Sequence, residues 1–365
     1  MNFLRQPKWW KRFLLGAIWT PVGAEIFLRL LSPVPMLPRY IQAGSHGVRA
    51  NMPDQTYRHR TPEYTVELRT NSKGMRADVE FSLKKPEGTL RIVVLGDSFG
   101  MGYGVDLDET SLSILESMLE SELQCDVEIL NFSVSGFGPS EELIVLEAEA
   151  MQYQPDLVIQ YYTSTDLVDD TRSGLFRIED GELVRSGDTY LPAVKTRELL
   201  FSFAAYRWLA GESHLYNLVR DSAGTKVKAI LALLRSLKPA EQDTASDKAN
   251  SSSKSSKNAS GADLTLAILD RMRDVVESSG ARFEILSVPV RSNRSKFVEY
   301  FPGDPDKHPF ITPLPLFEQA DGRMLYWERS HGHWTPLGCR LVAETLAGEI
   351  IERGLLGTPC KSPAS

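Results

Sequence analysis

The stretch VVLGDSFGMGYGV, residues 93–105, carries an apolar, β-branched run into a serine surrounded by small residues. Val93, Val94 and Leu95 are typical of a buried strand, and Gly96, Asp97 and Ser98 follow them directly. The serine is either an ordinary turn residue or a nucleophile. The residues that other parts of the chain place at the end of this strand decide between a turn residue and a nucleophile.

Further apolar runs and amphipathic segments alternate along the chain on both sides of this stretch. We expect strands over 91–96, 127–132, 157–162 and 283–288, and helices over 109–123, 140–153, 263–279 and 335–353. Residues 197–237 are predicted to form two or three more helices, and 324–327 a short strand. The alternation implies right-handed crossovers and a parallel sheet covered on both faces. The predicted class is therefore α/β, with the main domain over residues 91–355.

The segments outside this alternation have other compositions. Residues 33–90 lack clear periodicity and are predicted to be a connector packed on the domain. Residues 238–261 contain almost no large apolar side chain, so we expect a disordered insertion that buries too little surface to offset its ordering entropy. Residues 356–365 are predicted to be a C-terminal tail.

The N-terminal segment, residues 1–32, places basic residues before an apolar run. Its uncharged part, residues 13–24, is about 12 residues long, whereas a bilayer requires ~20. Glu25 and Arg29 interrupt the run, but their spacing allows them to pair on one helix face. A single-pass anchor from Trp9 to Leu31 is our first hypothesis, with the domain outside the cytoplasm. An interfacial helix, an uncleaved signal-like segment and a domain on the cytoplasmic face are the alternatives.

The overall composition excludes some classes of function. The formal net charge of −7 disfavours nucleic acid as a partner, since a nucleic-acid surface needs a basic footprint. The three cysteines, Cys125, Cys339 and Cys360, are scattered and predict neither a disulfide framework nor a zinc site. We predict no metal and no cofactor.

Chemically suggestive residues follow each of the first three predicted strands. Ser98 follows the first, Gly136 follows the second and Thr165 follows the third, while His333 precedes the last helix. The carboxyl ends of parallel strands meet at one edge of a sheet, where ligands bind. A serine needs a base to become nucleophilic, and an acyl-transfer intermediate needs hydrogen-bond donors for its oxyanion. These four residues could supply both.

The order of these blocks resembles the SGNH/GDSL hydrolases. GDSF at Gly96–Phe99 matches the nucleophile block, NFSVSGFG the glycine block and HWTPLGCRLVAETL the histidine block, while NSKGMRAD at Asn71–Asp78 looks like a segment of membrane-tethered bacterial members. The resemblance implies a three-layer α/β/α, flavodoxin-like fold with a parallel sheet of about five strands. It also implies Ser98 as nucleophile, His333 as base, and the N–H groups of Ser98 and Gly136 as oxyanion donors.

Two positions depart from the family pattern. The family has Gly-Asn-Asp in its third block, with the Asn as oxyanion donor, whereas this chain has Ser164-Thr165-Asp166, so a shorter hydroxyl would have to donate. The family also places an aspartate two or three residues before the histidine, where this chain has His331 and Ser330. The imidazole of His333 would then be held by a backbone carbonyl or by a carboxylate from elsewhere, for which Glu328 and Asp321 are candidates without the usual spacing.

Several other polar residues near these blocks have candidate roles. We expect Asp97 to cap its loop, and His331 to support His333, to contact substrate or to be exposed. Asp166, Asp169 and Asp170 form an acidic cluster that we expect in a solvated loop, with cation binding as the alternative.

Three functional interpretations follow from this pattern. The first is a working Ser98–His333 dyad that hydrolyses esters, and the second is a slow or specialised O-acyltransferase. Both would act on an acyl-ester or carbohydrate substrate, such as O-acetyl groups of an exported polysaccharide, from a domain attached to the membrane by its N-terminal segment. The third is a pseudoenzyme that keeps the pocket for binding or assembly. A cytoplasmic lipase-like enzyme with an interfacial helix is a weaker alternative.

Overall fold

A computed structural model describes residues 9–36, 40–220, 222, 253–293, 296–320, 324–330 and 332–357. The chain divides into two compact units. The smaller comprises Met1–Pro38, His59–Thr65 and Leu199–Ser246, and the larger comprises Arg39–Arg58, Val66–Glu198 and Asp247–Ser365. Each unit is described by itself.

The larger unit is built on a parallel sheet. Its strands are β5 (Leu90–Leu95), β6 (Val127–Asn131), β7 (Leu157–Tyr162) and β10 (Arg282–Ser287), in the spatial order β6-β5-β7-β10. This is the flavodoxin-like order that the sequence predicts, with the chain reversing direction across the sheet between β5 and β7. Among the described residues, four strands form this sheet, where the resemblance implies about five. Beyond β10, Ile311 makes only an isolated parallel bridge to Leu286.

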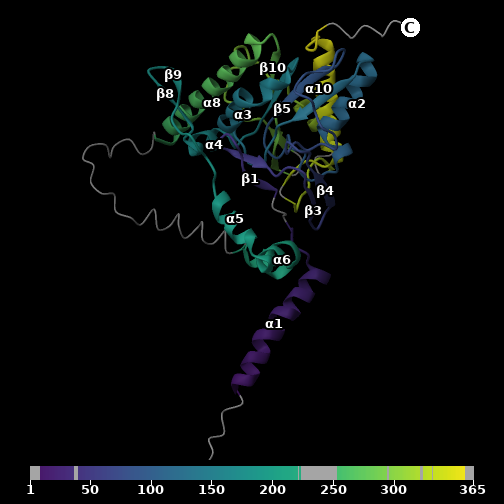
Figure 1. The fold of residues 1–365 in the computed structure, drawn as a ribbon, viewed down its shortest axis with the longest axis vertical. Coiled ribbons are helices and arrows are strands. Elements are labelled where there is room, and N and C mark those ends of the chain that lie inside the picture. The colour runs from purple at the N-terminus through teal and green to yellow at the C-terminus, as the bar shows by residue number, and fades with distance from the viewer. Residues whose placement is uncertain are drawn as a thin grey trace, which may run out of the picture. The chain divides into compact units, whose positions relative to one another are not determined.

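Helices cover both faces of this sheet, so the layers are α/β/α (Figure 1). Alternate residues of β5 face opposite layers because side chains of a strand alternate in direction. Ile92 and Val94 belong to the core beneath α2 (Ser111–Leu123) and α10 (Pro336–Glu352). Val93 and Leu95 belong to the core beneath α3 (Pro139–Ala148) and α8 (Ser253–Ser278). Both faces are apolar, which explains why the strand is a continuous apolar run.

Shorter elements complete the described chain. Four two-stranded sheets pair β1 with β2, β3 with β4, β8 with β9, and β11 with β12. The bounds of the remaining elements are α1 (Trp9–Leu31), β1 (Ile41–Ala43), β2 (Arg49–Asn51), β3 (Thr56–Arg60), β4 (Thr65–Arg69), η1 (Leu107–Glu109), η2 (Ala150–Tyr153), α4 (Asp166–Ser173), β8 (Phe176–Glu179), β9 (Glu182–Arg185), α5 (Val194–Ser202), α6 (Ala204–Glu212), β11 (Val290–Asn293), β12 (Lys296–Val298) and α9 (Leu314–Gln319).

The structure corrects some sequence expectations. Helix α8 begins at Ser253, so residues 253–261 of the expected disordered insertion are helical, while 238–252 lie outside the described residues. Extending an existing helix costs little, because each added residue also adds a hydrogen bond. The short strand expected over 324–327 is reduced to a bridge between Tyr326 and Trp334. Residues 358–365 of the predicted tail are not among those described.

Two further findings concern the N-terminal segment and the cysteines. The predicted anchor residues form α1, but no helix in the described part of the chain has the length and apolarity needed to cross a bilayer. Cys125 is disulfide-bonded, contrary to the expectation from its isolated position, and Cys339 is free and buried. A cysteine's partner is set by the fold, which spacing along the chain does not reveal.

Candidate active site

Ser98 lies in a tight loop at the carboxyl end of β5, near the middle of the sheet. Backbone bonds from Met101 N to Asp97 O and from Tyr103 N to Ser98 O, both 3.0 Å, close this loop. A Cβ at Gly96 would lie 2.9 Å from the Cβ of Tyr161, so the first residue after the strand has to be glycine. The loop leaves Ser98 half-buried. The small residues of the quoted stretch therefore allow the serine to approach the sheet edge closely.

Asp97 stabilises the same loop through its side chain. Its Oδ1 accepts a hydrogen bond of 2.8 Å from Phe99 N, and its side chain also bonds to Thr163 at the end of β7. Burial raises the pKa of Asp97 to about 7. The aspartate thus ties the serine loop to the neighbouring strand, in agreement with the capping role expected for it.

His333 is held by a hairpin-like turn immediately before α10. Tyr326 and Trp334 form an antiparallel bridge, and Trp327 N donates to His333 O at 2.9 Å. The helix begins at Pro336 after Thr335, whose side chain accepts from Gly338 N. The indole of Trp327 donates to Gly104 O at 3.0 Å and so joins the turn to the serine loop.

The two predicted reacting residues meet at this edge of the sheet. His333 Nε2 lies 2.8 Å from Ser98 Oγ, although the residues are 235 positions apart. The imidazole packs between two aromatic rings of the serine loop, with centroid distances of 5.0 Å to Phe99 and 4.9 Å to Tyr103. This distance is within hydrogen-bond reach, so His333 is positioned to take a proton from the serine.

Gly136, the first predicted oxyanion donor, has a left-handed backbone with φ of +80°. Glycine adopts this conformation without strain, whereas other residues rarely do. The guanidinium of Arg49 donates to the carbonyls of Ser135 and Gly136 and makes a two-pronged ion pair with Glu141. Burial raises the pKa of Glu141 to about 7, while Arg49 acts in the opposite direction. The carbonyls on both sides of the Gly136 N–H are therefore tied to one buried ion pair.

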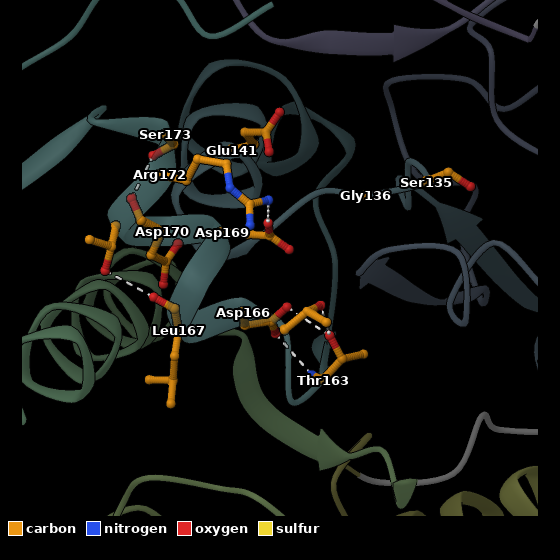
Figure 2. Close-up of polar contacts among 12 residues, drawn as sticks. Ser135, Gly136, Glu141, Thr163, Asp166, Leu167, Asp169, Asp170, Arg172 and Ser173 are labelled. Atoms are coloured by element: carbon orange, nitrogen blue, oxygen red, sulfur yellow. Dashed lines mark hydrogen bonds and ion pairs between the residues drawn. The ribbon is translucent and has the colours of Figure 1, made fainter. Parts of the chain in front are cut away.

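Thr165, the second predicted donor, is an exposed residue at the N-terminus of α4. Its Oγ1 lies 3.1 Å from the Thr163 hydroxyl, and Thr163 in turn bonds to Asp97. Figure 2 shows that Thr163 also bonds to Asp166. The third block is thereby linked to the serine loop through side chains. Asp166 accepts from both the backbone N–H and the hydroxyl of Thr163, which gives it a structural role at the turn.

Three residues are candidates for supporting or orienting His333, namely Glu328, Asp321 and His331. Glu328 forms an ion pair with Arg291 at 3.2 Å. Asp321 and His331 lie outside the described residues. Ser330, one of the two positions where the family has its aspartate, is completely buried. Ring contacts with Phe99 and Tyr103 help to orient the imidazole.

The acidic cluster was expected in a solvated loop, and this expectation was wrong. The three aspartates lie on α4, where Asp166 and Asp170 are buried (Figure 2). Asp170 accepts from Ser140 N at 2.7 Å and from the Thr265 hydroxyl, so it joins α3, α4 and α8. Burial raises the pKa of Asp170 to about 6. No group of three or more His, Cys, Asp or Glu among the described residues has a geometry suited to a metal ion.

Sequence analysis overlooked Arg49, Glu141, Phe99 and Tyr103. Arg49 and Glu141 are 92 positions apart, and Arg49 lies in the segment predicted to be a connector. The two aromatic residues lie one and five residues after the serine in the quoted stretch, so their proximity to a candidate nucleophile was a usable signal. Nothing in the local sequence around Arg49 provided one.

Comparison with known proteins adds limited information. No protein-family model and no curated protein matches the sequence. Among solved structures, the chain is similar to a lipase from a goat rumen metagenome, with 15% identity, a TM-score of 0.36, and coverage of 74% of this chain and 98% of that one. It is also similar to a GDSL-like lipase from Bacteroides thetaiotaomicron, with 10% identity, a TM-score of 0.33 and coverage of 72% and 88%.

A third similar structure is an acetylxylan esterase from Geobacillus stearothermophilus, with 12% identity, a TM-score of 0.29 and coverage of 72% and 94%. Similarities at this level carry no argument about the activity of this chain. The fold and the order of the site blocks are those that the SGNH/GDSL resemblance implies, as the strand order and the loop positions of the chain itself show.

Proposed function

We propose that this protein is a serine-dependent ester hydrolase with Ser98 as nucleophile and His333 as general base. The observation that carries the proposal is the 2.8 Å separation of His333 Nε2 and Ser98 Oγ at the carboxyl edge of a parallel sheet. A solvated turn serine would not need an imidazole packed against it by two aromatic rings.

The chemistry proceeds in two halves. Ser98 Oγ attacks the ester carbonyl carbon while His333 Nε2 takes the hydroxyl proton, and the alcohol leaves with that proton as the acyl-enzyme forms. Water then attacks the acyl carbon, gives a proton to His333 and releases the acid as Ser98 is reprotonated. The N–H groups of Ser98 and Gly136, with the Thr165 hydroxyl, hold the oxyanion in both halves.

The departures from the family pattern affect the expected rate. A threonine hydroxyl in place of an asparagine amide has a shorter reach, and losing one oxyanion donor typically costs ~10²–10³ in turnover. The family's aspartate before the histidine is replaced by His331 and Ser330, and ring contacts with Phe99 and Tyr103 help to fix the imidazole of His333. We therefore expect turnover below that of a complete triad.

A second part of the proposal concerns the acyl acceptor and the compartment in which the domain lies. We propose an extracytoplasmic domain attached to the membrane through α1, where a sugar hydroxyl can replace water as acyl acceptor and O-acetyl groups of an exported polysaccharide are the substrate. The disulfide at Cys125 supports an oxidising compartment, since such bonds are rare in the cytosol. Release of acetate from O-acetylated polysaccharide, compared with transfer to an added oligosaccharide, distinguishes hydrolysis from transfer.

A fluorophosphonate probe tests the nucleophile. We expect the wild type to be labelled, Ser98→Ala to be unlabelled, and the control Ser117→Ala, which changes an exposed serine of α2, to be labelled like the wild type. Thermal unfolding establishes that each variant is folded. A folded wild type that resists labelling and cleaves no activated ester would contradict the proposal and favour a binding protein.

A further inference from the structure

The smaller unit carries a large amount of exposed apolar surface, beginning with α1. Between Phe13 and Leu31 this helix exposes large apolar side chains on more than one side: Phe13, Leu15, Ile18, Trp19, Val22, Ile26, Phe27, Leu30 and Leu31. A helix that is apolar on several sides is normally buried in a protein core or in a membrane. The described residues of α1 that make polar contacts with another segment of this unit are Glu25 and Arg29, in the C-terminal part of the helix.

The two charged residues of α1 that interrupt its apolar sequence are satisfied inside the unit. Glu25 accepts hydrogen bonds from Arg29 at 2.7 Å, from the Ser213 hydroxyl at 2.9 Å, and from His214 N and Leu215 N at 3.0 and 2.8 Å. Arg29 also donates to the carbonyl of Glu212, the last residue of α6. Both charged groups therefore clamp α1 to the chain at the end of α6.

The chain around α6, which this clamp holds beside α1, also exposes several large apolar side chains. Phe203 is 58% exposed and Trp208 is 59% exposed, and the other large exposed apolar side chains of the segment are Leu199, Leu200, Leu218 and Val219. We call residues 199–219 the α6 segment. Four of the six tryptophans of the chain belong to the smaller unit, namely Trp9, Trp10, Trp19 and Trp208. Tryptophan is enriched at membrane–water interfaces, where its ring is partly buried and its N–H stays solvated.

We propose that the α6 segment is a second lipid-contacting surface, which the Glu25–Arg29 clamp holds beside α1 so that the smaller unit meets the bilayer through two elements. The inference rests on the proposed membrane attachment of α1. A bilayer fits the surface better than a second copy of the chain. Arg5, Lys8, Lys11 and Arg12 flank the apolar run with no acidic residue before Glu25, which suits anionic headgroups and would repel an identical chain.

An environment-sensitive fluorophore on the α6 segment tests this proposal in the full-length protein. Trp208→Cys is labelled with a nitrobenzoxadiazole group and bound to vesicles of three parts phosphatidylcholine to one part phosphatidylglycerol. Cys339 is buried and Cys125 is disulfide-bonded, and mock-labelled wild type measures any labelling of the native cysteines, Cys360 included. Tyr300→Cys is the matched control, because Tyr300 is an aromatic residue of the larger unit with 57% exposure.

We expect the label at position 208 to shift to the blue, to brighten severalfold on vesicles and to be quenched by spin-labelled lipids, while the label at 300 does not respond. A protein that binds vesicles but leaves the label at 208 in water would overturn this inference and leave the attachment through α1 standing. Failure to bind vesicles at all would overturn both. Shielding at 208 that follows protein concentration without lipid quenching would indicate a second copy, and would also contradict the proposal. Ester hydrolysis by the same samples reports separately on the Ser98 chemistry.

Discussion

At the scale of single residues, the proposed active site contains groups that contact Ser98, Gly136 and His333 without taking part in the proposed bond changes. Phe99 and Tyr103 restrict the imidazole of His333, and Asp97 fixes the loop of Ser98. Arg49 does the same for Gly136, because one guanidinium binds two loop carbonyls and the Glu141 carboxylate. The planar guanidinium can do this, whereas an ammonium group lacks the fork of donors. Arg49 is therefore a positioning residue.

Replacing Arg49 with lysine tests this role. Arg49→Lys keeps a positive charge beside buried Glu141, but one ammonium cannot hold the carboxylate and both carbonyls in the same geometry. We expect kcat for a small activated ester to fall by up to about 10²-fold, as misplacement of a catalytic group by 1 Å can do, with KM little changed. Steady-state kinetics measure the change.

Arg69→Lys is the matched control, since Arg69 makes ion pairs with Glu67 and Asp78 at the surface. The control should retain wild-type kinetics. If Arg49→Lys instead raised KM at constant kcat, Arg49 would be acting on substrate binding and not on the Gly136 donor.

At the scale of elements, buried carboxyl groups join α3 and α4 beneath the site. Glu142 of α3 accepts from Gln160 on β7 at 3.0 Å, and Asp97, Glu141, Asp166 and Asp170 are the acidic groups that surround it. Burial raises the pKa of Glu142 well above its usual value, and the neighbouring negative charges add to this effect. These elements are therefore held together best when the carboxyl groups keep their protons.

This arrangement predicts that stability falls as the pH rises. A carboxyl group whose pKa is higher in the folded state binds more protons there than in the unfolded state, so its contribution is present below the unfolded pKa near 4.5 and is lost as the pH rises through the folded value. Glu142→Gln removes one such group. We expect it to reduce the loss of unfolding free energy between pH 5 and pH 8.

Urea unfolding at the two pH values measures this difference. Glu147→Gln is the control, because Glu147 lies on the same helix but is exposed and pairs with Arg271. Its pH dependence should match the wild type. A wild-type protein that is more stable at pH 8 than at pH 5 would show that these carboxyl groups are ionised in the fold.

At the scale of the whole molecule, two units with different surfaces share one chain. The larger buries its apolar residues in two layers around the sheet, and the smaller exposes them on α1 and the α6 segment. The disulfide at Cys125, directly before β6, adds a covalent constraint to the larger unit. Such a link stabilises a protein mainly by restricting its unfolded chain.

The number of free thiols tests this constraint. In denaturant without reductant, we expect a thiol titration to find one reactive thiol, from Cys339, and after reduction to find all three cysteines of the chain. Reduction should also lower the melting temperature, consistent with the typical contribution of about 2–4 kcal/mol. Three thiols before reduction would mean that Cys125 is not oxidised in the native protein.

The sequence by itself determined the α/β class, the position of each sheet strand to within one or two residues, and the blocks that supply Ser98, Gly136, Thr165 and His333. Buried parallel strands are continuous apolar runs, and glycine-rich loops after them are visible in the order of residues along the chain. This information is local, so it can be obtained from the sequence without knowledge of distant contacts.

Only the tertiary structure decided which distant groups meet. It paired Arg49 with Glu141, buried Asp166 and Asp170, placed Phe99 and Tyr103 against His333, and joined Glu25 of α1 to the end of α6. Each of these depends on packing between segments far apart in the chain. The local sequence of a charged residue does not reveal whether its side chain is solvated or forms a buried ion pair. The free-energy difference between these two states depends on burial and on partners that only the fold supplies.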